Sequence, residues 1–167
     1  MNESYVECLV KKKTSTAAIV GKYTLYILAF AFFILSLMNG LTVIPLLLAV
    51  IIGVIGYFVT IRTDLEYEYL YLDKELTIDK VMAKTSRKRV AVYQLDRMEI
   101  LAPMKSYHLD DYRNRTVTVK DYSIGYEDQP DRRYCMYYEG GVKLILSPSP
   151  EMIKMMKNVA PRKVFEE

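Results

Sequence analysis

Between Tyr23 and Ile61 the chain carries no charged residue, and this gap restricts the possible folds more than any other feature of the sequence. Two apolar runs fill it, Ala17–Met38 and Leu41–Ile61. As helices they would extend about 33 Å and about 31 Å, enough to cross a hydrocarbon core of roughly 30 Å. Asn39-Gly40 between them favours a tight turn. The sequence therefore predicts a transmembrane helical hairpin over residues 17–61, with spans at 17–38 and 41–61.

Two other interpretations of the apolar runs are weaker. A cleaved signal peptide would be shorter than the first run, would end at a small-x-small cleavage site and would not be followed at once by a second span. A buried soluble hairpin would need a larger partner core than the remaining residues supply. Pro45 lies in the first turn of the second run, where its missing N–H costs little, and so indicates a helix start near Thr42.

Basic residues flank the two spans, whereas the turn between them is uncharged; these residues are Lys11, Lys12, Lys13, Lys22 and Arg62. By the positive-inside rule, both termini are expected in the cytoplasm, with residues 1–16 as a cytoplasmic N-terminal segment. Cys8 and Cys135 belong to no Cys-x-x-Cys or Cys/His spacing. We expect both to be reduced thiols, as in other cytoplasmic regions.

Small residues recur on both spans, where they allow helices to approach closely. They are Gly21, Ala29 and Ser36 on the first span and Ala49, Gly53 and Gly56 on the second. Packing within one hairpin explains them more simply than a seam between two copies. A homo-oligomer stays open as an alternative.

After Ile61 the composition changes to that of a soluble domain. Residues 62–167 hold all but four of the 23 Lys and Arg residues and all but two of the 20 Asp and Glu residues. This near balance of charge argues against a surface built for nucleic acid. Leu65–Leu72 and Leu76–Met82 have strand composition and are joined by Asp73-Lys74-Glu75, which predicts a β-hairpin.

Two registers are possible for this hairpin. A two-residue loop places Tyr69 and Tyr71 opposite Ile78 and Leu76. A three-residue loop places Leu70 and Leu72 opposite the same two residues and sets Glu68 opposite Lys80. We prefer the three-residue loop because its cross-strand charges attract.

Five more strands are expected, at residues 89–93, 98–102, 116–124, 133–139 and 142–147, with Glu139-Gly140-Gly141 joining the last two as a hairpin. Residues 103–115 could be a loop or a short helix. Ser149, Pro150 and Pro161 bound a helix at about 150–160. One face of this helix is apolar and is expected to close the end of a small barrel, with a binding surface as the alternative; its residues are Met152, Met155, Met156 and Val159.

Seven strands followed by one helix is the element order of a pleckstrin-homology (PH)-like domain. The stretch YLYLDKELTIDKVMAKTSRKRVAVYQLDRMEIL resembles the first half of bacterial PH-like domains, through Leu76 and Ile78, the basic Arg87-Lys88-Arg89, and Leu95 with Met98. With its two spans, the chain is similar to bacterial, Firmicutes-type membrane proteins that carry such a domain after a helical hairpin. The resemblance implies an α+β chain: a transmembrane hairpin, then a seven-stranded antiparallel β-barrel or sandwich over 62–167, capped by the C-terminal helix.

The sequence offers few groups for catalysis, and we expect a non-enzyme without metal or cofactor. His108 is the only histidine, beside Asp110 and Asp111. These side chains could touch a divalent metal, but a lone imidazole in a polar segment is more often a surface residue. No GxSxG motif, phosphate-cradling glycine loop or paired-cysteine metal site occurs.

Arg87, Lys88 and Arg89, which we place in a turn, are the candidate site. A domain tethered to the membrane brings such charges close to the anionic inner leaflet, where each contributes about 1 kcal/mol of attraction. A solvated hairpin end is the simpler reading of the same residues. We expect a membrane-anchored interaction or scaffolding module with an unknown protein partner. The alternatives are an inner-leaflet anionic-lipid sensor and an accessory subunit of a membrane transporter or enzyme complex.

Overall fold

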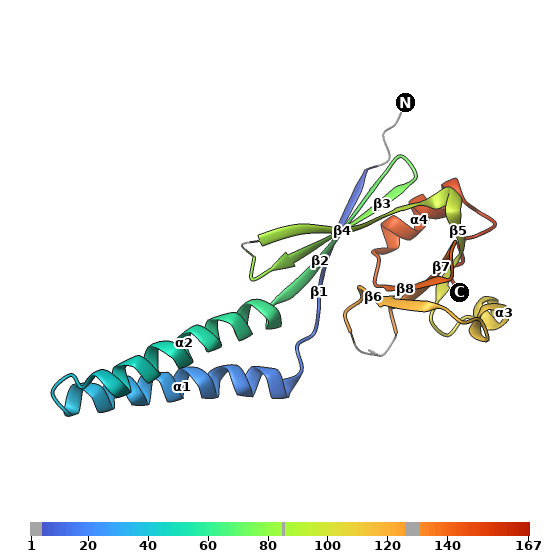
Figure 1. The fold of residues 1–167 in the computed structure, drawn as a ribbon. Helices are drawn as coiled ribbons and strands as arrows, with labels where there is room; N and C mark the ends of the chain where they lie inside the picture. The colour runs from blue at the N-terminus through green and yellow to red at the C-terminus, as the bar shows by residue number, and fades with distance from the viewer. Residues whose placement is uncertain (1–4, 85, 126–130) are drawn as a thin grey trace. The chain divides into compact units, whose positions relative to one another are not determined.

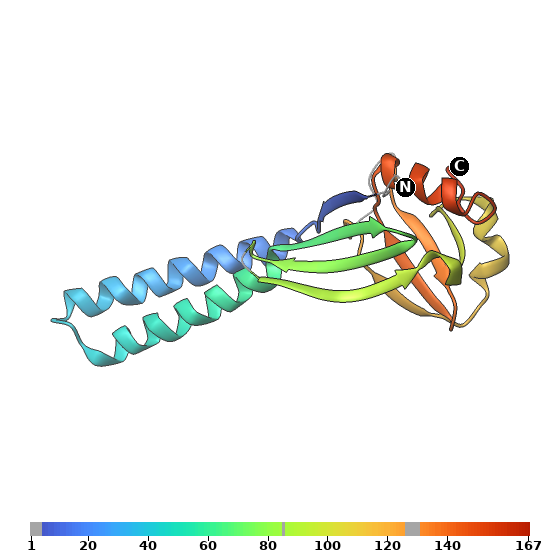
Figure 2. The same cartoon turned by 90° about the horizontal axis from the view of Figure 1, so that it is seen from above.

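The structure, a computed structural model, describes residues 5–84, 86–125 and 131–167 (Figures 1 and 2). The chain divides into two compact units. The helical unit comprises Thr14–Leu65 and Met82–Ser86, and the sheet unit comprises Met1–Lys13, Glu66–Val81 and Arg87–Glu167. The chain is therefore α+β, with two long helices, two four-stranded sheets and a C-terminal helix.

The helical unit is an antiparallel pair, α1 (Thr16–Met38) and α2 (Val43–Thr63), which lie side by side in both views (Figures 1 and 2). Helix α1 begins where the Ser15 hydroxyl accepts a hydrogen bond from the Ala18 N–H at 3.2 Å. Thr42 is the N-cap of α2, which confirms the predicted start. The turn between the helices is closed at Gly40, whose φ of +71° suits glycine.

Small residues on the two helices contribute unequally to their contact. Ser36, Ala49 and Gly56 are buried, and a Cβ at Gly56 would lie 3.4 Å from the Tyr26 ring. A Cβ at Gly21 or Gly53 would meet nothing within 4 Å. Part of the predicted small-residue stripe therefore packs this hairpin together, as expected.

Both helices are long and apolar enough to cross a membrane, although those properties alone are weak evidence for a span. Apolar side chains point outward on every side of the pair. Ile27 is 69% exposed, Phe30 is 65% exposed and Ile44 is 76% exposed. An apolar surface of this extent is unusual for a soluble monomer.

The first sheet contains β1 (Val6–Lys11), β2 (Leu65–Leu72), β3 (Glu75–Met82) and β4 (Ser86–Gln94), in that spatial order. Strand β1 was not predicted from the sequence. Its six residues lie before the first apolar run, in residues 1–16, which we expected only to form an N-terminal segment. It pairs antiparallel with β2, from Val6 opposite Tyr71 to Lys11 opposite Glu66. The helical hairpin is thus an insertion between two neighbouring strands of one sheet.

The preferred three-residue loop of the β2–β3 hairpin was wrong. Strand β2 ends at Leu72 and β3 begins at Glu75, and the two loop residues have positive φ, +46° at Asp73 and +68° at Lys74. Such a pair of angles is typical of a two-residue type I′ turn. The two-residue loop brings tyrosines and aliphatic residues together on the buried face; these are Tyr69, Tyr71, Leu76 and Ile78, none more than 1% exposed. Burial of that face outweighs the attraction of the single cross-strand charge pair that the three-residue loop would have formed.

The second sheet has the order β5-β7-β8-β6, with β5 (Met98–Pro103), β6 (Thr118–Asp121), β7 (Tyr134–Tyr138) and β8 (Val142–Leu146). Strands β7 and β8 form the predicted hairpin, but β6 pairs parallel to β8. Within the described residues, eight strands with one parallel pair therefore replace the seven antiparallel strands that we expected. Strand β6 is shorter than predicted because the Asp121 carboxylate accepts hydrogen bonds from the Ser123 N–H and hydroxyl, which turns the chain.

The segment left open at residues 103–115 is largely helical. It contains the short helical turns η2 (Tyr107–Leu109) and α3 (Asp110–Arg113). A third turn, η1 (Leu95–Arg97), links β4 to β5. Buried Leu109 anchors the segment against Ile100, Ala102 and Tyr137 of the second sheet.

The tyrosines of β2 explain the charged, tyrosine-rich alternation that follows the second apolar run. Tyr69 is fully buried, and its hydroxyl donates to the Tyr122 carbonyl at 2.6 Å and accepts from the Ser147 N–H at 3.3 Å. Burial raises the pKa of Tyr69 far above its ordinary value, so it is a neutral donor at physiological pH. The ring fills the core while the hydroxyl joins the first sheet to residues beside the second.

Helix α4 (Pro150–Val159) closes the sheet unit. The Ser149 hydroxyl accepts from the Met152 N–H at 3.2 Å, which confirms the predicted cap. The buried face is rotated from the predicted stripe: Met152, Ile153 and Met156 are buried, whereas Val159 is 39% exposed.

We predict that Met156→Asp will abolish the cooperative thermal unfolding of the sheet unit in the full-length protein. Met156 is 1% exposed, so the change buries a carboxylate without a partner and costs several kcal/mol, comparable with the stability of a small domain. Lys154→Asp on the exposed face of the same helix is the matched control and should shift the midpoint by only a few degrees. The near-ultraviolet circular dichroism of the buried tyrosines reports the transition. Equal midpoints for both variants would contradict this placement of the helix.

Candidate functional site

The basic residues predicted to form a turn lie instead at the start of strand β4. β4 is the outermost strand of the first sheet, beside β3. The side chains of Arg87, Lys88 and Arg89 are all exposed there. Charged residues on an outer strand also discourage pairing with another chain, which is a structural reason for their presence.

Arg87 is held by two carboxylates of the same sheet. Its guanidinium lies 2.7 Å from Glu68 on β2 and 2.8 Å from Asp79 on β3, and Arg89 lies 3.7 Å from Asp79. The Glu68 and Asp79 side chains are only 8% and 7% exposed, so Arg87 neutralises charges that would otherwise be buried without a partner. Neither carboxylate could be singled out from the sequence, because strand alternation alone suggests that both face solvent.

A third carboxylate, Glu7 on β1, joins this cluster. A hydrogen bond between Glu7 and Glu68 lowers the pKa of Glu7. Burial, followed by the same hydrogen bond, raises the pKa of Glu68. Because the pKa values of these hydrogen-bonded carboxyl groups shift in opposite directions, Glu68 binds a proton at higher pH than Glu7, and the charge on this face of the sheet depends on pH.

These contacts leave the three basic residues in different situations. Two of them, Arg87 and Arg89, point their charges at the sheet's own carboxylates, while Lys88 forms no ion pair within the described residues. Contact of this segment with lipid stays a prediction, and the geometry makes Lys88 its most available member.

The His108 ring is occupied by aromatic packing. It stacks on Phe165 with 3.7 Å between ring centroids and lies 3.9 Å from the Tyr107 ring. In the described part of the chain, no group of three or more His, Cys, Asp and Glu side chains could hold a metal ion.

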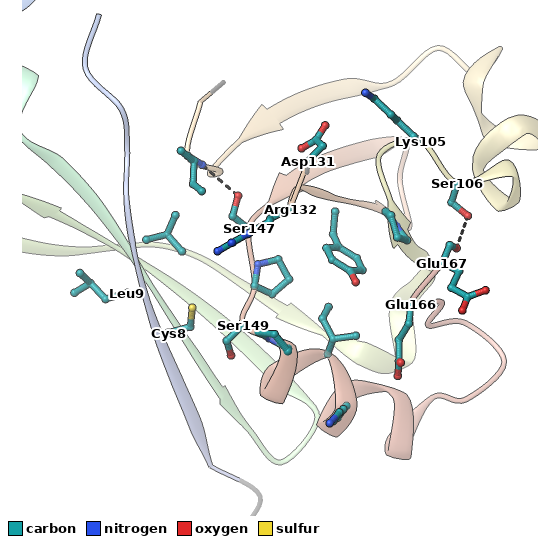
Figure 3. A pocket seen from close by; sticks show the side chains of 18 of the residues that line it. Cys8, Leu9, Lys105, Ser106, Asp131, Arg132, Ser147, Ser149, Glu166 and Glu167 are labelled. Atoms are coloured by element: carbon teal, nitrogen blue, oxygen red, sulfur yellow. Dashed lines mark hydrogen bonds between the residues drawn. The ribbon is translucent and has the colours of Figure 1, made fainter. Parts of the chain in front are cut away.

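A larger feature lies elsewhere in the sheet unit, where a groove of about 870 Å³ opens between β1, the start of α4 and the loops that flank the second sheet (Figure 3). Most of its lining is apolar, including Leu9, Val10, Tyr134 and Ile153. Serine residues from two segments also line it, Ser106 after β5 and Ser147 and Ser149 in the link between β8 and α4. A mostly apolar groove of this size with a few polar groups is typical of a binding site.

Charged residues line the rim of the groove, four basic and three acidic; they are Lys11, Lys105, Arg132, Lys154, Asp131, Glu166 and Glu167. Asp131 is bound by Arg133 at 2.9 Å, and this contact holds the pKa of Asp131 below its usual value. Glu166 pairs with Lys157 at 3.2 Å. Neither Arg132 nor Lys154 forms an ion pair with any residue that the structure describes, so the rim carries an excess of positive charge.

The sequence did not predict this groove. Its residues come from β1, the β5 end, the approach to β7, the β8–α4 link and the C-terminal residues, so only the folded chain brings them together. A β-strand prediction for residues 6–11 would have been a useful clue, since apolar residues stand at every second position, Val6, Cys8 and Val10, although Leu9 interrupts a strict alternation.

We predict that Arg87→Ala will lower the thermal midpoint of the sheet unit at pH 7 by several degrees. The change leaves Glu68 and Asp79 buried without their shared counter-charge. Because the folded pKa of Glu68 is raised, protonation of Glu68 favours the folded state, and stability falls as the pH rises above the unfolded value of roughly 4.3. The deficit of Arg87→Ala should therefore shrink as the pH is lowered through the Glu68 pKa. Lys88→Ala is the matched control, and its thermal midpoint should equal that of the wild type both at pH 7 and below the Glu68 pKa. If the loss of thermal midpoint in Arg87→Ala does not change with pH, the role of Glu68 is wrong.

The comparisons with known proteins identify the family of this chain. No curated protein and no solved structure matches it. A family model described as "Bacterial PH-like domain (DUF6106)" matches residues 2–166, which include β1 and both apolar helices as well as the two sheets and α4. The match agrees with the resemblance seen in the sequence, and the chain belongs to the Bacterial PH-like domain (DUF6106) family.

Proposed function

We propose that this chain is a non-catalytic interaction or scaffolding module, held at a membrane by α1 and α2. The observation that carries the proposal is the open, mostly apolar groove beside β1. A PH-like domain with such a groove, attached to two apolar helices, can hold a partner at a membrane surface without chemistry of its own.

Two features support insertion of the helical hairpin in a membrane. Its outward surface is apolar on every side, and the hydroxyl of Thr14 donates to the Thr63 carbonyl at 2.8 Å, which ties the base of α1 to the end of α2. The chain thus enters and leaves the hairpin at one point. Lys11, Lys12, Lys13 and Arg62 flank the two helices in the sequence, so by the positive-inside rule we expect both termini in the cytoplasm.

Anionic-lipid sensing is the competing function, and the ion pairs of the basic segment weaken it. Arg87 already contacts Glu68 and Asp79, and binding to a lipid phosphate would break those contacts or have to share them. A protein partner is therefore the better-supported ligand. An accessory subunit of a transporter or enzyme complex is one form that this function can take.

We predict that a membrane-permeable lysine cross-linker, added to intact cells that produce the full-length chain, will join it to a distinct protein partner. A membrane-impermeable reagent with the same spacing should leave the chain unlinked, because the sheet unit and both termini are expected in the cytoplasm. Equal cross-linking by both reagents would place the sheet unit outside the cell.

Vesicle binding separates the two functions. A lipid sensor would give no cross-linked partner. The full-length chain in nanodiscs would instead bind phosphatidylserine vesicles, and both Lys88→Gln and high salt would abolish that binding. These results together would show that the interaction module is wrong.

A further inference from the structure

The two edges of the second sheet differ in how they are covered. Strand β5 is one edge, and the C-terminal segment pairs with it: the Leu101 N–H donates to the Lys163 carbonyl at 2.7 Å, and the Phe165 N–H donates to the Leu101 carbonyl at 2.8 Å. Strand β6 is the other edge, and all four of its residues, Thr118–Asp121, are exposed. Proteins usually cover an edge strand or place several charges on it, because its unpaired backbone groups invite another strand. None of the described residues pairs with β6 on its outer side.

The hydrogen bonds of β6 show which of its backbone groups face outward. The Thr118 N–H donates at 2.8 Å to the carbonyl of Gly141, just before β8, and the Tyr122 N–H donates at 2.9 Å to a carbonyl within β8. Successive residues of a strand direct their backbone groups to opposite sides. The N–H and C=O groups of Val119 and Asp121 therefore face outward, away from β8.

Apolar side chains beside this edge are incompletely covered. Val119 is 55% exposed. It lies opposite Lys143 in the β6–β8 register, and the Lys143 ammonium lies 5.6 Å from the centre of the Tyr137 ring. Val117, two residues earlier and on the same face, packs against the buried cluster that contains Tyr137. A strand beside β6 with an apolar residue opposite Val119 would extend this cluster.

We propose that β6 pairs with β6 of a second copy of this chain, antiparallel and across a two-fold axis at Thr118. In this register Val119 of each copy lies opposite Val117 of the other, and their outward backbone groups form the hydrogen bonds. Each Asp121 lies opposite Arg115 of the other copy. The second sheets of the two copies then join into one continuous sheet.

Charge favours this register. A two-fold axis at Lys120 would place two lysines directly opposite each other, which destabilises a strand pair. The axis at Thr118 instead brings Arg115 and Asp121 together twice. Arg115 already donates to Glu99 at 2.6 Å, but its side chain is 51% exposed, and a guanidinium has N–H groups enough to bind a second carboxylate.

Membrane attachment makes such a short pairing effective. An isolated pair of strands is only marginally stable in water. When α1 and α2 hold both copies in one bilayer, the copies meet at a raised effective concentration. This step rests on the proposed function, because it needs the membrane attachment proposed there.

Disulfide cross-linking of the full-length chain in phospholipid vesicles tests the pairing. Opposite residues of a non-hydrogen-bonded antiparallel pair have Cα atoms about 4.5 Å apart, which is within the range of a disulfide. Thr118→Cys should therefore give a covalent dimer on mild oxidation. Lys88→Cys, exposed on the outer strand of the other sheet, is the matched control and should stay monomeric. Both variants keep Cys8 and Cys135, so a dimer specific to Thr118→Cys forms through β6.

Proline at two neighbouring positions separates the outer side of β6 from the inner side. Val119→Pro removes an outward N–H without touching the pairing with β8. Added to Thr118→Cys, it should lower the cross-linked fraction by about tenfold or more and leave a cooperative thermal transition. Lys120→Pro removes an N–H that points toward β8, and it should lower the thermal midpoint.

Three results would overturn the proposal: no dimer from Thr118→Cys, as much dimer from Lys88→Cys, or a dimer that Val119→Pro does not reduce. A fourth would do the same. If Val119→Pro unfolds the chain as Lys120→Pro does, the outward N–H is bonded within the chain and is not available to a second copy.

Failure of this inference is distinguishable from failure of the proposed function. Carbonate extraction of the vesicles reports membrane attachment: an extracted chain would overturn the attachment and the pairing that depends on it, whereas an attached chain without a dimer overturns only the pairing. Because Thr118–Asp121 do not line the groove, the interaction module predicts that a distinct cellular partner still cross-links to Val119→Pro.

Discussion

The pairing of β1 with β2 is the interaction on which the rest of the structure depends. These strands are separated in sequence by the whole helical hairpin, yet Lys11 and Glu66 are direct partners in the ladder. The pairing fixes the two ends of the hairpin at one point, so if the helices cross a membrane, both chain ends lie on the same side. It also places β1 along the groove, which is lined by the four residues from Cys8 to Lys11. One six-residue strand thus connects membrane attachment, sheet formation and the candidate binding surface.

Successive residues of β2 point to opposite faces of the first sheet, and the two faces differ in their chemistry. Tyr67, Tyr69 and Tyr71 are buried on the inner face, where rings fill the core and the Tyr69 hydroxyl bonds to backbone beside the second sheet. Glu68 on the other face binds Arg87 and is hydrogen-bonded to Glu7. The charged face is therefore not simply solvated. It links β1, β2, β3 and β4 through side chains in addition to the backbone ladder, which is why its arginines are poor candidates for free lipid-binding groups.

The sequence predicted those elements whose evidence is local. Apolar length marked both long helices, Ser149 and Pro150 marked the start of α4, and the glycines at 140 and 141 marked the β7–β8 turn. It failed where the deciding contacts are distant in sequence. Strand β1 has too few residues to be recognised without β2, the parallel pairing of β6 depends on β8, and the β2–β3 register was decided by burial in a core that no single hairpin reveals. The groove could not be predicted for the same reason, since segments far apart in the sequence form it.

The most direct measurement compares two chains that both lack the helical unit. One contains residues 64–167 alone, and the other joins residues 5–13 to residues 64–167 through a short Gly-Ser linker that lets β1 pair with β2. If β1 is an integral strand of the first sheet, the joined chain will show tyrosine near-ultraviolet circular dichroism and one cooperative thermal transition, and residues 64–167 alone will show neither. A cooperative transition with the same midpoint in both chains would contradict the central role of the β1–β2 pair.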